Sequence, residues 1–267
     1  MQLDPIAVKA GVRLRALAAV GSTNEEARLL AKRGERGPLW ITAVAQTAGR
    51  GRLDRSWVSP EGNLYASLLL SEPSPLEHAP ELGFVAALAL RDAVVALEPA
   101  LAPPLRFKWP NDLLHGRDKC AGILIEGEVG TDQSIAVVIG IGVNCTTHPA
   151  TAPDRPATHL GAHLGADAAD ITPQRLFREL SATMCQRIET WARGTGFSAI
   201  LHDWVAAARG IGEEITVRNG GGEKHGRFAG LDSSGRLILE LHGGGTERIS
   251  AGDVFPFELA RDGHGSV

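Results

Sequence analysis

The chain has 267 residues, of which 43% are hydrophobic and 22% charged. This composition is typical of a folded globular protein with a substantial core, and the length fits one large domain or a large and a small one. A net charge of −4 gives no overall field that would attract nucleic acid, and three widely spaced cysteines predict neither a disulfide framework nor a zinc site.

The first 21 residues mix apolar and basic side chains and do not form a secretory signal sequence. The longest apolar run, residues 84–90, is too short to cross a bilayer. We therefore expect a cytoplasmic protein without a membrane span.

A helix start follows at residues 22–26. Ser22 and Glu25 have the spacing of a capping box, which predicts a helix through about Lys32. The polar side chains of Ser22, Thr23 and Asn24 would lie at the positive end of this helix, where a polar ligand group can also bind. The segment suits a cap, a ligand contact or both.

An apolar, β-branched run at residues 39–45 predicts a buried strand, and residues 46–57, here called the arginine loop, leave its end. The loop contains Gly49, Arg50, Gly51, Arg52, Arg55 and Trp57. Glycines allow close backbone approach, guanidinium groups bind carboxylate or phosphate, and the indole offers a flat face. The segment matches neither common phosphate-binding loop, so a plain surface connection is the alternative.

Alternating or continuous apolar patterns predict strands at residues 63–71, 105–109, 119–126 and 134–144, with a helix at 76–97. Pro110, Asn111 and Asp112 form a predicted turn. Gly140 and Gly142 lie on one face of the last strand and leave room for a flat group, or for a bulge or close helix packing.

The C-terminal third begins with little pattern. His159 and His163 have a spacing that also suits metal ligands on a helix, but Gly161 lies between them and no carboxylate accompanies them, so we predict no protein metal site. Helices are predicted at residues 173–193, with Thr172 as cap, and at 197–208.

After Gly210 the pattern changes to short strands at 213–218, 224–231, 236–241 and 246–250, separated by glycine turns. Regular spacing of this kind predicts a small antiparallel barrel. We place the boundary near Arg209, which gives a first domain of residues 1–209 and a second of residues 210–267.

Five motifs now occur in a recognisable order: Ser22-Thr23-Asn24, Gln46 to Arg52 with Trp57, Lys108 to Asp112, Lys119-x-Ala121-Gly122-Ile123-Leu124 and Gly140-x-Gly142-x-Asn144. Over residues 20–255 the chain resembles the biotin protein ligases. The resemblance implies an α+β fold, in which a mixed β-sheet with packed helices, as in class II aminoacyl-tRNA synthetases, is joined to a small C-terminal SH3-like β-barrel.

The resemblance implies a biotin–[acetyl-CoA-carboxylase] ligase. Biotin reacts with ATP and Mg²⁺ to give biotinyl-5′-AMP, and biotin then passes to one lysine of a biotin carboxyl carrier protein domain. A lipoyl or octanoyl protein ligase or transferase of the related fold is the alternative, and a non-catalytic binding module is a third possibility. Only 21 residues precede Ser22, so we expect the short form without DNA binding, as monomer or homodimer.

The resemblance also assigns roles to residues. The biotin-binding set is Ser22, Thr23, Asn24, Gln46, Gly49, Arg50, Gly51, Arg52, Lys108 and Gly122, with Ile123 and Leu124 along the acyl chain. The adenylate-binding set is Arg50, Arg52, Trp57, Lys108, Asn111 and Asn144. Chemistry is assigned to Lys108, assisted by Arg50 and Arg52. Asn111 and Asp112 either assist metal or phosphate or only form a turn.

Overall fold

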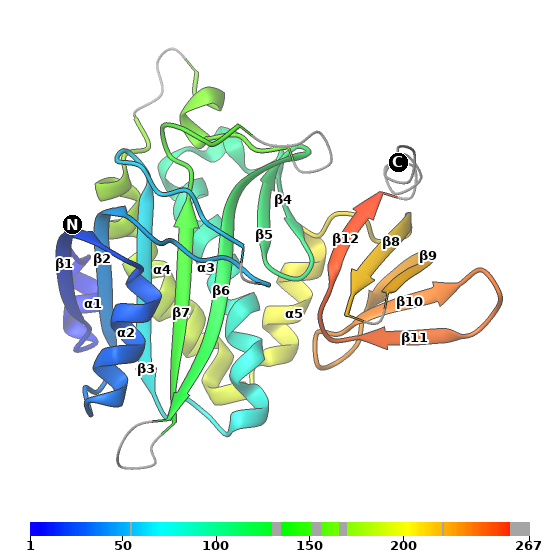
Figure 1. Ribbon diagram of the computed structural model, residues 1–267, viewed down its shortest axis with the longest axis horizontal. Coiled ribbons are helices and arrows are strands. Elements are labelled where there is room, and N and C mark those ends of the chain that lie inside the picture. The colour runs from blue at the N-terminus through cyan, green and yellow to red at the C-terminus, as the bar shows by residue number, and fades with distance from the viewer. Residues whose placement is uncertain (54, 130–134, 151–155, 166–169, 221, 257–267) are drawn as a thin grey trace.

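The computed structural model describes residues 1–53, 55–129, 135–150, 156–165, 170–220 and 222–256 (Figure 1). Its main element is a seven-stranded sheet with the order β1-β2-β3-β7-β6-β5-β4. The strands are β1 (Arg13–Val20), β2 (Leu39–Gln46), β3 (Leu64–Ser71), β4 (Leu105–Lys108), β5 (Asp112–His115), β6 (Asp118–Val129) and β7 (Ile135–Val143). Strands β1 and β2 pair in parallel, and the other neighbours pair antiparallel. The expected mixed sheet is confirmed.

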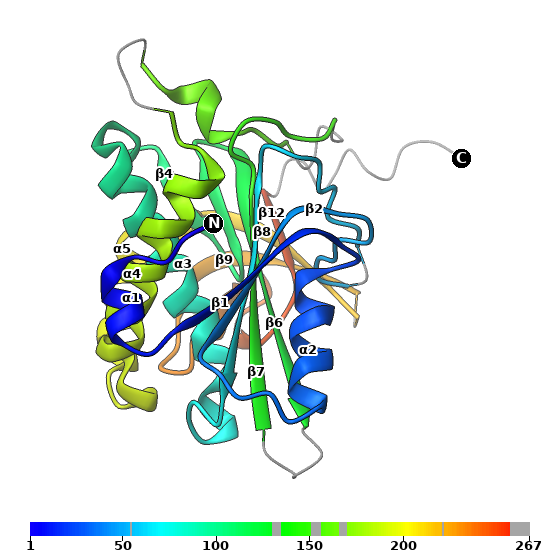
Figure 2. The same cartoon turned by 90° about the vertical axis from the view of Figure 1, so that its left-hand side faces the viewer.

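Helices cover both faces of this sheet, as the edge-on view in Figure 2 shows. The larger layer contains α1 (Pro5–Lys9), α3 (Leu82–Leu97), α4 (Pro173–Trp191) and α5 (Phe197–Ala206), and the opposite face carries α2 (Thr23–Lys32). Short 3-10 turns lie at η1 (Leu76–Glu81), η2 (Pro99–Leu101), η3 (Leu160–His163) and η4 (Ala192–Gly194). In the described part of the chain, no helix has the length and apolar character needed to span a membrane.

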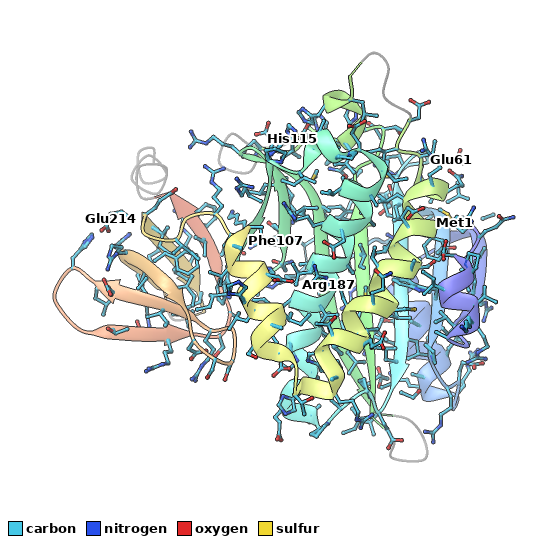
Figure 3. The ribbon with its side chains drawn as sticks, turned by 180° about the vertical axis from the view of Figure 1, so that it is seen from behind. Met1, Glu61, Phe107, His115, Arg187 and Glu214 are labelled. Carbon is cyan, nitrogen blue, oxygen red and sulfur yellow. The ribbon has the colours of Figure 1, made fainter. Side chains whose placement is uncertain are left out.

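The two helical layers contact the sheet with different kinds of side chain. Helix α3 is apolar on most sides because it is buried between the sheet and α4. Arg187 of α4 joins three helices, with its Nε 2.6 Å from Asp92 of α3 and its Nη1 2.6 Å from Asp203 of α5 (Figure 3). Helix α2 instead turns small residues, Ala27 and Ala31, toward the sheet and so lies close to it.

A second sheet stands beside β4, β5 and α5 (Figure 1). It has the order β11-β10-β9-β8-β12 and consists of β8 (Glu214–Asn219), β9 (Gly222–Leu231), β10 (Leu237–Leu241), β11 (Thr246–Ile249) and β12 (Asp253–Pro256). All of its pairs are antiparallel, as expected. Its buried residues Phe228 and Leu237 belong to the same hydrophobic core as the first sheet, and Trp109 Nε1 donates to the Gly235 carbonyl at 3.0 Å.

Three sequence-based predictions were incomplete or wrong. Strands β1, β5 and β12 were not predicted, and the helix expected from residue 76 begins as the 3-10 turn η1. The capping box was wrong: Ser22 is the N-cap residue of α2, but its side chain makes no capping hydrogen bond, and Glu25 pairs with Arg28 and Arg50 instead. Some predicted residues lie outside the described part of the chain. They are Asp54 of the arginine loop, Ser134 of the strand predicted at 134–144, Gly221 of a glycine turn, and residues 257–267 of the second domain.

Candidate functional site

A cavity of about 520 Å³ lies between the arginine loop, the face of the first sheet around β6 and β7, and the second sheet. This volume is usual for small-molecule sites. Its lining includes these residues from the sequence-based prediction: Ser22, Thr23, Asn24, Gln46, Arg50, Gly51, Arg52, Trp57, Lys108, Asn111, Asp112, Gly122, Ile123, Leu124 and Asn144. Gly49 is buried next to the lining, where the Trp57 carbonyl and the Ser59 hydroxyl leave no space for a Cβ. The five motifs therefore converge on one place.

Glycines form the floor of this cavity. Gly122 of β6 pairs with Gly142 of β7, and the indole of Trp57 lies against both. A Cβ on Gly142 would come 2.6 Å from Trp57 Nε1, so only glycine fits beneath the ring. Trp57 Nε1 is buried and has no hydrogen-bond partner among the described residues. The two glycines of this strand have different neighbours: Gly142 lies under a flat group, the Trp57 side chain, whereas Gly140 packs closely against Asn24 of helix α2, as the alternative of close helix packing predicted.

A chain of hydrogen bonds joins the start of α2 to the arginine loop. Gln46 Oε1 accepts from the Thr23 backbone N–H at 2.8 Å and from Thr23 Oγ1 at 3.1 Å. Gln46 Nε2 donates to Ser59 Oγ at 2.9 Å, and Ser59 Oγ donates to the Trp57 carbonyl at 2.8 Å. These contacts fix the orientation of the Gln46 amide. Ser59 holds the end of the loop, a role that sequence reasoning missed because its motif carried no signal for it.

Arg50 lies at the α2 side of the cavity. Its guanidinium pairs with Glu126 of β6 at 3.0 Å and with Glu25 of α2 at 3.3 Å. Glu126 also accepts from Asn24 Nδ2 at 2.9 Å, while Asn24 Oδ1 lies 2.6 Å from Ser67 Oγ. Arg50 and Asn24 are therefore held by the same carboxylate, which was not predicted.

Arg52 has a different environment. Its Nη1 donates to two neutral oxygens, Asn111 Oδ1 at 3.1 Å and the Gly252 carbonyl at 3.4 Å. Burial lowers the pKa of the Arg52 guanidinium from its ordinary value, while the charge of Asp253 opposes this shift. Asn111 Nδ2 donates to the Ile123 carbonyl at 2.8 Å, so the turn role and a contact to a cavity arginine coexist in this residue.

Two lysines add to the charged lining, which also includes Arg55, Arg117, Arg209, Asp112, Asp118, Glu213 and Asp253. Lys108 is the last residue of β4, as predicted for a strand end, and its Nζ lies 5.3 Å from the centroid of the Phe255 ring. Lys119, which the sequence analysis quoted without assigning a role, pairs with Asp112 and lies 5.3 Å from the centroid of a Trp57 ring. The cavity thus carries several cations, whose mutual arrangement suits a ligand with more than one negative group.

The contacts of Asn144, His159 and His163 are mainly structural. Asn144 is buried beside the cavity and its Nδ2 donates to the Thr158 carbonyl at 2.9 Å. His163 stacks on His115 with 3.6 Å between ring centroids, and burial lowers the pKa of both imidazoles. His159 Nδ1 accepts from the Ala162 N–H. Among the described residues, no three His, Cys, Asp or Glu side chains are placed to hold a metal ion.

Comparison with known proteins gives matches along most of the chain. The model of the biotin/lipoate A/B protein ligase family matches residues 20–144, and that of the biotin protein ligase C terminal domain matches residues 210–255. The biotin–[acetyl-CoA-carboxylase] ligase of Paracoccus denitrificans is 41% identical over 245 residues, which cover 90% of this chain and 98% of that protein.

Two solved structures have the same fold. The biotin protein ligase from Aquifex aeolicus in complex with biotin and ATP gives a TM-score of 0.73 at 26% identity, covering 91% of this chain and 97% of the other. The Leishmania major enzyme in complex with biotinyl-5-AMP gives 0.62 at 26% identity, covering 90% and 99%. Fold and cavity define the class as that of the biotin and lipoate protein ligases. Within this class, the chain belongs to the biotin protein ligase family.

Proposed function

We propose that the cavity binds biotin and MgATP, joins them as biotinyl-5′-AMP and transfers biotin to a lysine of a biotin carboxyl carrier domain of acetyl-CoA carboxylase. The observation that carries this function is that one cavity brings together the residues assigned to biotin and to the adenylate. Arg50, Arg52, Lys108 and Lys119 all line it. Among proteins with this fold, one is solved with both biotin and ATP.

The chemistry needs positive charge more than it needs a protein nucleophile. A biotin carboxylate oxygen attacks the α-phosphorus of ATP, and pyrophosphate leaves. The neutral ε-amine of the carrier lysine then attacks the acyl carbon of the mixed anhydride, loses its proton and expels AMP. Because carboxylate and triphosphate repel each other, fixed cations lower the barrier by holding both in reacting geometry. Lys108 and Arg52 supply this charge, and magnesium enters as the counter-ion of ATP.

The polar network at the start of α2 suits the ring of biotin, because Ser22, Thr23 and Gln46 offer both donors and acceptors in a buried setting. The acyl chain would follow the wall made by Gly122 and its neighbours toward the lysine at the end of β4. We propose that adenine binds against Trp57 near Asn144, which requires the indole to share or leave its place on the glycine floor.

A lipoyl or octanoyl ligase or transferase is the alternative activity, because the first family model includes lipoate enzymes. The match of residues 210–255 to a biotin protein ligase domain and the 41% identical relative favour biotin. The same proposal places the enzyme in the cytoplasm, as monomer or homodimer. It treats residues 1–209 as the catalytic domain and 210–267 as a second, SH3-like domain.

Mass spectrometry after incubation with ATP, Mg²⁺ and biotin tests this function. We expect biotinyl-5′-AMP in the protein fraction and pyrophosphate release that depends on biotin. Lipoate or octanoate in place of biotin is the matched control. Pyrophosphate release with lipoate alone would assign the alternative activity, and no release with any acid would leave only a binding function.

A further inference from the structure

The last strand of the second sheet lies against the cations of the cavity. Strand β12 and the residue before it contribute Asp253, Val254, Phe255 and the Gly252 carbonyl to this contact. These residues lie about 200 positions from the arginine loop in sequence, so the contact is purely tertiary.

Four cationic side chains contact this segment. Asp253 forms an ion pair with Arg55 that uses both carboxylate oxygens, including one contact of 3.3 Å to Nη1. The Gly252 carbonyl accepts from Arg52 at 3.4 Å. The Phe255 ring faces Lys108 at 5.3 Å and Arg218 at 4.7 Å.

The arginine loop is also held by hydrogen bonds between its own backbone groups. The Gly51 N–H donates to the Arg55 carbonyl at 2.7 Å, and the Trp57 N–H donates to the Gly49 carbonyl at 2.9 Å. These bonds shape the loop but do not join it to the second sheet. The side chain of Arg55, by contrast, extends to Asp253.

We infer that residues 252–255 act as a latch that positions the arginine loop and Lys108 over the bound acyl-adenylate, with Asp253 as the positioning residue. This inference rests on the proposed function and gives the second sheet a role in retaining the intermediate. An ion pair with one side chain 40% exposed adds little to overall stability, so its main effect falls on the position of the loop.

The test uses the full-length protein with Asp253→Asn, Arg55→Gln and the charge reversal Arg55→Asp with Asp253→Arg. We expect each single variant to release biotinyl-5′-AMP about two- to fivefold faster, the range for a half-exposed ion pair. The charge reversal restores slow release. Glu240→Gln is the matched control, because Glu240 pairs with Arg227 in the same sheet but outside the cavity lining.

Limited trypsin digestion gives a second readout that does not depend on activity. Asp253→Asn keeps every arginine of the loop, so we expect faster cleavage within residues 50–56 at unchanged melting temperature. Unchanged release and unchanged cleavage in Asp253→Asn would overturn the latch, as would failure of the charge reversal to restore slow release. If the wild type forms no biotinyl-5′-AMP, the proposed function fails, and the digestion alone decides whether the latch exists.

Discussion

Cations of similar charge have different surroundings in this cavity. Arg50 pairs with two carboxylates, whereas Arg52 donates to an amide and a backbone carbonyl. A guanidinium bound to neutral oxygens keeps more of its charge for an incoming anion than one paired with Glu25 and Glu126. We therefore propose that Arg52, more than Arg50, supplies positive charge to the bound anions, a difference that the spacing of the two residues does not indicate.

Replacing Lys108 with alanine removes charge at the point where carboxylate and phosphate would meet. We expect biotin-dependent pyrophosphate release to fall by about two orders of magnitude or more, the usual effect of losing one preorganised electrostatic contact. The melting temperature should change little because Lys108 ends a short strand. Lys32→Ala, at a half-exposed lysine of α2, is the control. An unchanged rate would remove Lys108 from the mechanism.

Gly142→Ala tests the fit of Trp57 on the glycine floor. The new Cβ would lie 2.6 Å from the indole nitrogen, so the ring must move, and overpacking of this kind costs about 1–3 kcal/mol. Gly127→Ala on the neighbouring strand is the matched control, since nothing lies within 4 Å of its added Cβ. Chemical denaturation compares the two variants, and equal free energies of unfolding would mean that Trp57 does not rest on Gly142.

The arginine loop is the element on which the site depends, and its two ends are fixed by different means. At its start, Gln46 is the last residue of β2, pairs with Val20 of β1 and accepts from the Thr23 N–H in the first turn of α2. At its far end, Ser59 accepts from Gln46 and donates to the Trp57 carbonyl. The loop is thus closed at its base into a compact unit, and helix α2 shares that base through Thr23.

Helices α2 and α4 should respond differently to loss of the hydroxyl group of their N-cap residues. Thr172 accepts from the Arg175 N–H at the start of α4, whereas Ser22 makes no such bond at α2. We expect Thr172→Ala to lower the free energy of unfolding by about 1 kcal/mol and Ser22→Ala by less than about half of that. Urea denaturation measures both. A loss of about 1 kcal/mol in each variant would show that Ser22 caps α2 in solution.

The two sheets of the molecule share one large hydrophobic core, and a smaller one lies between α2 and the first sheet. The cavity lies where the two sheets meet, so a ligand there touches both. Binding to the native state alone raises the free energy of unfolding by about 2.7 kcal/mol when the ligand is at a hundredfold excess over its dissociation constant. An increase in the free energy of unfolding therefore shows which carboxylic acid binds in the cavity.

We expect biotin to raise the melting temperature and lipoate to leave it unchanged at equal concentration. Thermal unfolding at several ligand concentrations measures this, and the increase should follow the logarithm of the biotin concentration. Stabilisation by lipoate instead of biotin would favour the alternative activity. Addition of ATP and Mg²⁺ with biotin should raise the melting temperature further, because we expect the acyl-adenylate to contact both sheets.

Local patterns in the sequence determined most elements and the membership of the site. Periodicity and glycine turns are properties of neighbouring residues, so β2, β3, β6, β7, α4 and four strands of the second sheet could be predicted. The motifs likewise contain many of the residues that line the cavity, but not Asp253 or Phe255 of β12. Strand β1 was not predicted, because it pairs in parallel with β2 and parallel strands are not joined by a short turn that the sequence would reveal.

Only the tertiary structure decided how these residues are paired. Glu25 has the spacing to cap α2, yet it pairs with Arg50 because folding brings a guanidinium within 3.3 Å. Asp253 meets Arg55, and Phe255 meets Lys108, across the junction of the two sheets. Charge and ring contacts act through space, so their partners depend on how the sheets pack, which no spacing along the chain specifies.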